Sequence, residues 1–265
     1  MALLEVRNLD KTFVTRVGFR GRKQRHKAVD DVSFDVDSGE TVALVGESGA
    51  GKSTTGRLAL RLLQPDAGTV TFDGTDVLAL GARDLRRFRQ DAQMIFQDPH
   101  SSLDPRVTII ESVAEPLLVH GLGDRAERRR KAGDLLERVG IGPHLFQRYP
   151  AQLSGGQLQR AAIARALTTD PKVIVCDEPV SALDVSIRAQ VINLLDDLQT
   201  ERGIGYLFVT HDLALVESFA DRVVVMRNGA VVESADTETL FDSPQQDYTR
   251  TLLDSVPFLP EGVGS

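Results

Sequence analysis

The stretch Gly46-Glu-Ser-Gly-Ala-Gly-Lys-Ser53 fits the pattern of a phosphate-binding loop, in which a glycine and four further residues precede Gly-Lys-Ser or Gly-Lys-Thr. A short apolar segment at 41–45 comes before it and predicts a buried strand. Residues 52–63 follow, contain no proline, and predict a helix. Because strand, loop and helix come in the order that the pattern requires, the stretch predicts an α/β core that binds the phosphates of a nucleotide.

The residue types in this loop have physical reasons. Its glycines allow backbone conformations that turn successive N–H groups toward an anion, and the helix adds its positive N-terminal end. Lys52 is expected to reach the β- and γ-phosphates, Ser53 to hold Mg²⁺, and Thr54 to contact the α-phosphate. The expected nucleotide-binding residues here are Gly46, Glu47, Ser48, Gly49, Ala50, Gly51, Lys52, Ser53 and Thr54. The sequence has no Asn-Lys-x-Asp motif for guanine, which disfavours a GTPase.

Composition limits the functions that this chain can have. It has 265 residues and a formal net charge of −7, which argues against a dedicated nucleic-acid binder. One cysteine, Cys176, is too few for a disulfide framework, a cysteine-based zinc site or an iron–sulfur cluster, and fits a reducing cytoplasm. No apolar run approaches the roughly 20 residues of a membrane helix, and the N-terminus lacks the apolar core of a signal peptide. Work at a membrane would therefore need a partner.

A second candidate site follows the continuous apolar run at 173–176, which predicts a buried parallel strand. The run leads directly into Asp177 and Glu178, and carboxylates at the end of such a strand lie beside the phosphate loop of the same sheet. Asp177 is expected to hold Mg²⁺. Glu178 is expected to orient or deprotonate a water that attacks the γ-phosphate.

The remaining pattern mixes strands and helices. Alternating segments at 32–36 and 70–72 predict strands with one solvent-facing side, while the apolar runs at 206–209 and 223–226 predict further buried strands. Residues 98–168 change to loops and helical stretches and are interpreted as a helical insertion. The predicted division is a nucleotide-binding core at 1–97 and 169–240, an inserted helical part at 98–168, and a short C-terminal extension at 241–265.

The motif Leu153-Ser-Gly-Gly-Gln157 precedes a predicted helix inside this insertion. Two glycines and a serine at a helix N-terminus form an anion site of the same kind as the phosphate loop. The motif has no lysine of its own and lies far in sequence from that loop. We therefore expect it to act on a nucleotide held by another subunit.

With this motif, the phosphate loop and the two carboxylates, residues 3–240 resemble the ATP-binding-cassette family, whose signature is Leu-Ser-Gly-Gly-Gln. Gln97 resembles the family's loop glutamine, which touches Mg²⁺ and senses a membrane partner. His211 resembles its switch histidine, which contacts the γ-phosphate. Ser181-Ala-Leu-Asp184 resembles its dimer-communication loop, and Phe13 resembles the aromatic residue that stacks on adenine.

The resemblance implies a phosphate-loop NTPase core with a mostly parallel sheet, an antiparallel β subdomain and an inserted α-helical subdomain. It also implies ATP and Mg²⁺, and a head-to-tail dimer in which the signature of one subunit completes the ATP site of the other. The expected contacts from the second subunit's motifs are Ser154, Gly155, Gly156, Gln157 and Asp184. The expected catalytic residues are Lys52, Gln97, Glu178 and His211, and the expected metal ligands are Ser53, Gln97 and Asp177.

Several further sequence segments resemble those of cassettes of peptide and nickel importers. They are the segments 97–106 and 115–117, the tail 243–253, and a basic insert made of Arg16, Arg20, Arg22, Lys23, Arg25 and Lys27. The resemblance implies a peripheral subunit at the cytoplasmic face of the membrane. It further implies two transmembrane permease subunits, an external solute-binding protein that acts indirectly, and a second ATPase subunit that is either a paralogue or a second copy. Oligopeptides or dipeptides are the expected cargo, with nickel as a related one.

Other functions stay open at this point. The main alternative is a soluble cassette ATPase in repair, translation or cofactor assembly, although the chain lacks the long insertions or tandem copies typical of those proteins. An exporter cassette is a further alternative, and a simple kinase leaves the signature unexplained. The basic insert is interpreted as a mobile loop that either meets anionic lipid headgroups or is simply solvated.

Overall fold

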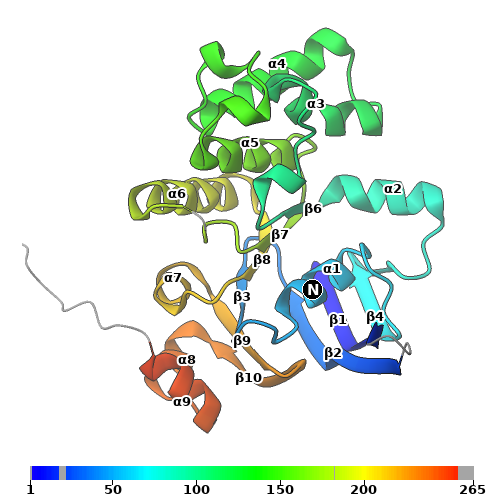
Figure 1. Ribbon diagram of the computed structural model, residues 1–265, viewed down its shortest axis with the longest axis vertical. Helices are drawn as coiled ribbons and strands as arrows, with labels where there is room; N and C mark the ends of the chain where they lie inside the picture. The colour runs from blue at the N-terminus through cyan, green and yellow to red at the C-terminus, as the bar shows by residue number, and fades with distance from the viewer. Residues whose placement is uncertain (1, 18–21, 182, 256–265) are drawn as a thin grey trace, which may run out of the picture.

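The computed structural model describes residues 2–17, 22–181 and 183–255, which form two sheets and a set of helices (Figure 1). The strands are β1 (Leu4–Val17), β2 (Arg22–Val36), β3 (Thr41–Val45), β4 (Ala67–Phe72), β5 (Thr75–Asp76), β6 (Ala92–Ile95), β7 (Val173–Asp177), β8 (Gly205–Val209), β9 (Arg222–Arg227) and β10 (Ala230–Asp236). The α-helices are α1 (Lys52–Ala59), α2 (Ala82–Asp91), α3 (Ile109–His120), α4 (Arg125–Arg138), α5 (Gly155–Leu167), α6 (Val185–Arg202), α7 (Leu213–Phe219), α8 (Thr237–Asp242) and α9 (Asp247–Asp254). Short 3-10 turns are η1 (Pro99–Ser101), η2 (Pro143–Leu145) and η3 (Pro150–Gln152).

The larger sheet has the strand order β10-β9-β3-β8-β7-β6. Its neighbours pair in parallel from β9 to β6, while β10 pairs antiparallel with β9. Every residue of β3, β7 and β8 is buried, as expected for strands that are covered on both faces. Leu44 of β3 and Asp177 of β7 both lie level with Val209 of β8, so the carboxyl ends of these strands meet at one edge.

The smaller sheet is antiparallel, with the order β2-β1-β4-β5. Its first two strands form a long hairpin whose pairing runs from Leu4 with Val36 to Val17 with Arg22. The interpretation of the basic insert as a loop is therefore wrong for residues 16–17 and 22–27, because cross-strand hydrogen bonds continue through them. Arg20 and the side chains of residues 16 and 22 lie outside the described part of the chain.

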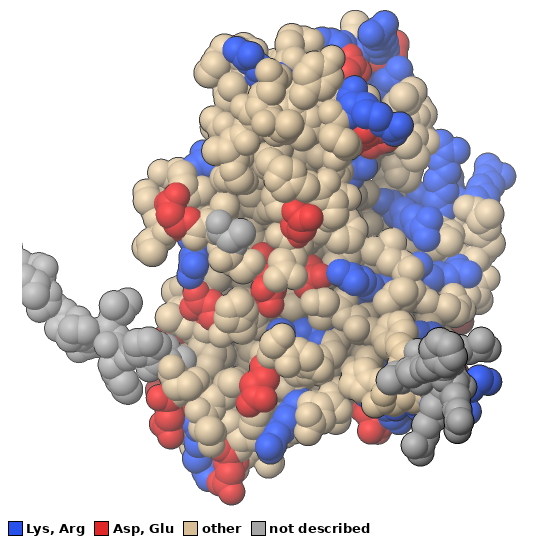
Figure 2. All heavy atoms as spheres, viewed as in Figure 1, with Lys and Arg blue, Asp and Glu red and all other residues tan. Residues whose placement is uncertain are grey.

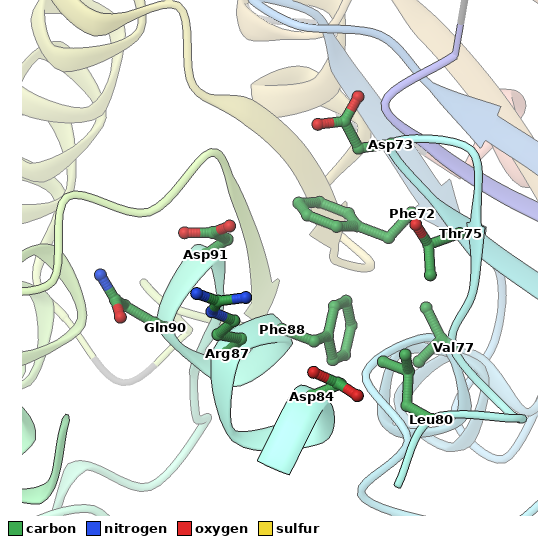
Figure 3. Close-up of a pocket in the computed structure, with 10 residues that line it drawn as sticks. All are labelled: Phe72, Asp73, Thr75, Val77, Leu80, Asp84, Arg87, Phe88, Gln90 and Asp91. Carbon is green, nitrogen blue, oxygen red and sulfur yellow. The ribbon is translucent and has the colours of Figure 1, made fainter.

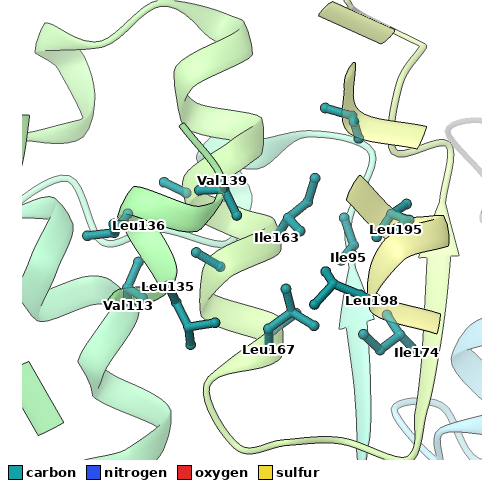
Figure 4. Packing of buried hydrophobic residues seen from close by; sticks show 14 of the residues in the cluster. Ile95, Val113, Leu135, Leu136, Val139, Ile163, Leu167, Ile174, Leu195 and Leu198 are labelled. Atoms are coloured by element: carbon teal, nitrogen blue, oxygen red, sulfur yellow. The ribbon is translucent and has the colours of Figure 1, made fainter. Parts of the chain in front are cut away.

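The segment between β6 and β7 contains the helices α3, α4 and α5, in agreement with the predicted helical content of 98–168. Their apolar faces meet in one cluster, in which Leu136 of α4 and Ile163 of α5 are fully buried (Figure 4). The same cluster reaches Ile174 of β7 and Leu195 of α6. The helices therefore share a core with the parallel sheet, and burial of apolar surface holds the two parts together.

Four helices, α2, α7, α8 and α9, were not predicted. The helix α2 is highly charged, and α7 and α8 are short. The predicted C-terminal extension contains α9 and only the end of α8, and the tyrosine and leucines of α9 pack against a small apolar cluster that includes residues of β3 and β9. The predicted helix at 52–63 is shorter in the structure, because Arg61 adopts a left-handed φ of 48° soon after α1 ends. The last ten residues, 256–265, lie outside the described part of the extension. Among the described residues, no helix is long and apolar enough to cross a membrane.

Candidate nucleotide site

The phosphate loop joins the end of β3 to the start of α1, as the sequence predicts. Gly51 has a φ of 100°, and a Cβ there would lie 2.2 Å from the carbonyl oxygen of Ala28. Gly46 has a φ of 144°, and a Cβ there would lie 2.1 Å from the carbonyl oxygen of Met226. Both positions therefore need glycine for conformation and for close backbone approach.

Lys52 folds back over the loop. Its ammonium group donates hydrogen bonds to the carbonyl oxygens of Gly46 (2.7 Å) and Glu47 (3.0 Å), and the residue is 5% exposed. Burial lowers the pKa of Lys52, an effect that the nearby carboxylates of Glu178 and Asp177 oppose. A buried lysine at a helix N-terminus whose partners include two neutral carbonyls is arranged to receive an anion.

Asp177 is brought to this loop by the alignment of strand ends. The hydroxyl of Ser53 donates to its Oδ1 at 2.6 Å, and the aspartate is 1% exposed. Its Oδ2 accepts no hydrogen bond from the described residues, and the guanidinium of Arg57 is 3.5 Å away. A buried carboxylate oxygen without a hydrogen bond is costly, so a further positive group at this position would stabilise it.

Glu178 lies at the centre of a hydrogen-bonded group. The amide of Gln97 donates to its Oε2 at 2.8 Å, and Nδ1 of His211 lies 3.3 Å from its Oε1, so a proton on that nitrogen is donated to the carboxylate. Glu178 also has a φ of 47°, which is rare for a residue of this type. Backbone strain of this kind costs about 1–3 kcal/mol and is typical of functional positions.

The signature residues are held by their own helix. Ser154 caps α5 through a reciprocal pair of hydrogen bonds, in which its Oγ accepts from the Gln157 N–H at 3.3 Å and its own N–H donates to Gln157 Oε1 at 3.0 Å. This arrangement leaves the hydroxyl proton of Ser154 free to donate to an anion. Gly155 has open space at its Cβ position, while Gly156 packs near Ile187. Within the described chain, the signature makes no hydrogen bond to the phosphate loop.

Among the described residues, Asp184 and Phe13 make no hydrogen bond to Glu178. Asp184 caps α6, its Oδ1 accepting from the Ile187 N–H at 3.0 Å. Phe13 is 37% exposed on β1 and pairs with His26, two residues before the Ala28 carbonyl that touches the phosphate loop. It is therefore on the hairpin that borders the loop, and its stacking on adenine stays a prediction.

Sequence reasoning missed two side chains at this site. Arg57 follows Ser53 by one helical turn, so helix spacing was a signal that could have found it. Tyr248 of α9 accepts a hydrogen bond from the Glu47 N–H at 3.3 Å, and no local pattern predicts a contact across 201 residues.

Pockets of this chain also lie away from the phosphate loop. A pocket of about 530 Å³ lies between the β4–β5 hairpin and α2, lined by the aromatic pair Phe72 and Phe88 and by polar residues such as Arg87 (Figure 3).

Figure 2 shows basic side chains gathered on the right of the molecule, where Figure 1 places α2, and acidic side chains nearer the middle. Glu47, Ser48 and Gly49 of the phosphate loop are exposed, so a second protein surface could cover them.

Comparison with known proteins gives a consistent result. The family model described as ABC transporter matches residues 29–181. A protein from Brucella ovis, named as a peptide import ATP-binding protein, is 52% identical over 255 residues, which cover 96% of this chain and 78% of the relative. The glutathione import ATP-binding protein GsiA of Salmonella typhi is 51% identical over 256 residues, which cover 96% of this chain and 41% of that longer protein.

Solved structures agree with these matches. The dimeric post-hydrolysis structure of the ATP-binding cassette MJ0796, bound to ADP and Pi, has a TM-score of 0.79 and 32% identity, covering 88% of this chain and 98% of that one. CbiO1 from Clostridium perfringens, part of the ABC transporter complex cbiONQ, has a TM-score of 0.76 and 28% identity, covering 91% of each chain. The predicted fold class, an α/β phosphate-loop core with an antiparallel sheet and helices, is confirmed.

Proposed function

Because the chain belongs to the ABC transporter family, we propose that it is the ATP-hydrolysing subunit of an importer that moves peptides or small peptide-like solutes. The observation that carries the proposal is the joining of three motifs by hydrogen bonds. Ser53 of the phosphate loop reaches Asp177, and the next residue, Glu178, accepts from Gln97. Motifs far apart in sequence are thereby held at one edge of the parallel sheet, where this fold binds nucleotides.

In this proposal Lys52 binds the β- and γ-phosphates of ATP, and the phosphate-loop N–H groups that make no hydrogen bond within the protein hold the phosphate chain. The carboxylate of Glu178 orients a water and accepts its proton as the water oxygen attacks the γ-phosphorus. The bond from that phosphorus to the bridging oxygen breaks, and ADP and phosphate are the products. Gln97 and His211 hold the carboxylate and sense the γ-phosphate region.

The residues at Asp177 fit Mg²⁺. A serine hydroxyl and a buried carboxylate with one oxygen free of hydrogen bonds are hard oxygen donors, which Mg²⁺ prefers. Among the described residues, no group of three or more acidic, histidine or cysteine side chains forms a metal cage, which suits an ion bound mainly by phosphates and water. Ser53, Asp177 and Gln97 would hold the ion, which when bound neutralises charge on the phosphates.

We further propose that two such subunits pair head to tail. The open phosphate loop of one would then face Ser154, Gly155, Gly156, Gln157 and Asp184 of the other. The dimeric cassette structures among the solved relatives support pairing. ATP bound between two subunits stabilises the pair, and hydrolysis releases it. The partner is either a paralogue or a second copy.

The names of the relatives favour an importer over a soluble ATPase of repair, translation or cofactor assembly. The chain would sit on the cytoplasmic side of a membrane beneath two permease subunits, with a solute-binding protein outside and with no nucleic-acid partner. Residues 1–97 and 169–240 would form the nucleotide-binding core, 98–168 the signature subdomain, and 241–265 a short extension. Peptides are the proposed cargo, and nickel is a related one.

The test reconstitutes the chain with its permease subunits in proteoliposomes. We expect ATP hydrolysis to rise several-fold when a peptide-loaded solute-binding protein is added on the opposite side. The same complex with an empty binding protein is the control, and stimulation by nickel in place of peptide would identify nickel as the cargo. A chain that hydrolyses ATP but never co-purifies with membrane subunits would favour the soluble alternative.

A further inference from the structure

The C-terminal extension touches the phosphate loop directly. The phenol oxygen of Tyr248, in α9, accepts a hydrogen bond from the backbone N–H of Glu47 at 3.3 Å. Glu47 is the second residue of the loop, and α9 lies well beyond residues 29–181 that match the family model. We propose that Tyr248 is a positioning residue that holds the backbone of the phosphate loop, so that α9 contributes to the nucleotide site. This inference rests on the proposed function, since it concerns ATP binding at the same loop.

The position of Tyr248 is fixed from more than one side. The guanidinium of Arg227, the last residue of β9, lies 4.6 Å from the centre of its ring, a cation–π arrangement. Tyr248 also packs against an apolar cluster that includes Ala43 and Val45 of β3, the strand that leads into the phosphate loop. The side chain of Tyr248 therefore contacts residues of both β3 and β9, the two strands that border the loop.

The start of α9 is anchored separately. The carboxylate of Glu233, in β10, accepts hydrogen bonds from the N–H groups of Gln245 (2.7 Å) and Gln246 (3.1 Å). Burial alone would raise the pKa of Glu233, but the hydrogen bonds it accepts outweigh burial and hold that pKa below its usual value. The ionised carboxylate is thus suited to hold the N-terminus of the helix that carries Tyr248.

Tyr248 is one of several groups that hydrogen-bond to the peptide groups of the phosphate loop. Inside, Lys52 binds the carbonyl oxygens of Gly46 and Glu47. Outside, the Gly229 N–H donates to the Ala50 carbonyl at 3.1 Å, and Tyr248 accepts from Glu47. With its outer peptide groups held, the loop keeps its remaining N–H groups directed at the phosphates, so less conformational entropy is lost when ATP binds.

Removing only the phenol oxygen tests the contact, since Tyr248→Phe keeps the ring and its packing. Losing one hydrogen bond of this kind should raise the Kd and KM for ATP about three- to tenfold. We expect kcat and the thermal midpoint without nucleotide to stay close to wild type, because the group acts on the loop before the chemical step. Tyr149→Phe, an exposed tyrosine far along the chain from α9, is the matched control.

A double-mutant cycle with Glu47→Pro separates positioning from general packing. Proline at 47 lacks the N–H that Tyr248 accepts, so Tyr248→Phe should add nothing further in that background. An unchanged ATP affinity in Tyr248→Phe, or effects of the two changes that simply add, would overturn the inference. Wild-type protein that fails to bind ATP would instead overturn the proposed function, so the two failures are distinguishable.

Discussion

At the scale of single residues, Glu178 carries most of the proposed chemistry. Its backbone is held in a left-handed conformation, its N–H donates to the Val209 carbonyl at 2.9 Å, and both carboxylate oxygens have partners. The strain is sustained by these contacts, which fix the carboxylate next to the end of the phosphate loop. Such pre-organisation is what a group that orients water requires.

We expect Glu178→Gln to reduce ATP hydrolysis by about 10²-fold or more, because an amide cannot accept the proton of the attacking water. ATP affinity should be nearly unchanged, since Lys52 and the loop N–H groups remain. Single-turnover hydrolysis and equilibrium binding of ATP measure the two quantities separately.

The exposed carboxylate of Glu217, in α7, gives the matched control as Glu217→Gln. Both variants lose one negative charge, so a nonspecific charge effect would change them equally. Hydrolysis by Glu178→Gln at the wild-type rate would refute the role of Glu178.

At the scale of elements, the phosphate loop depends on close backbone contacts with its neighbours. We expect Gly51→Ala to weaken ATP binding by more than about tenfold, because the added methyl group would meet the Ala28 carbonyl in a conformation that alanine resists. Gly81→Ala is the control, since a Cβ there meets nothing within 4 Å and the φ of −72° suits any residue. Calorimetric binding and thermal unfolding of both variants provide the measurement. Equal behaviour of the two would show that the loop can move away from Ala28.

The sequence predicts the elements of this fold unevenly. The apolar strands β3, β7 and β8 and the cap of α5 are local patterns, and so is the order of the motifs that they carry. The basic end of the β1–β2 hairpin, at 22–27, has no such pattern, because this part of β2 is polar and its pairing is set by the facing part of β1. The helix α2 is mostly charged and buries only Phe88, so it has too few apolar residues to be recognised from an apolar pattern.

The residues of the candidate site were also predicted only where a local pattern marks them. Lys52, Ser53, Asp177 and Glu178 could be predicted because strand ends in a parallel sheet share one edge. The contact of Tyr248 with the loop depends on how α9 folds back across β9 and β10, which sequence spacing does not encode.

At the scale of the whole molecule, the proposed site is shared between two chains, and mixing defective subunits tests this. Lys52→Ala damages the phosphate-loop half of a site, and Gly156→Asp places a negative charge in the signature half. Each variant alone should be inactive. In a mixed head-to-tail pair, both defects fall in one site and the other site is intact, so an equimolar mixture should regain roughly a quarter of wild-type hydrolysis.

A second mixture, of two variants that are defective in the same half of the site, is the control. Lys52 and Glu178 belong to the same half, so a mixture of Lys52→Ala with Glu178→Gln has a defect in both sites and should stay inactive. Size measurement of Glu178→Gln with ATP checks that the chain pairs with itself under the assay conditions. If copies do pair, yet Lys52→Ala and Gly156→Asp fail to restore each other, the signature does not act across the dimer. If copies do not pair, the same logic applies to this chain and a paralogue, with one change placed in each.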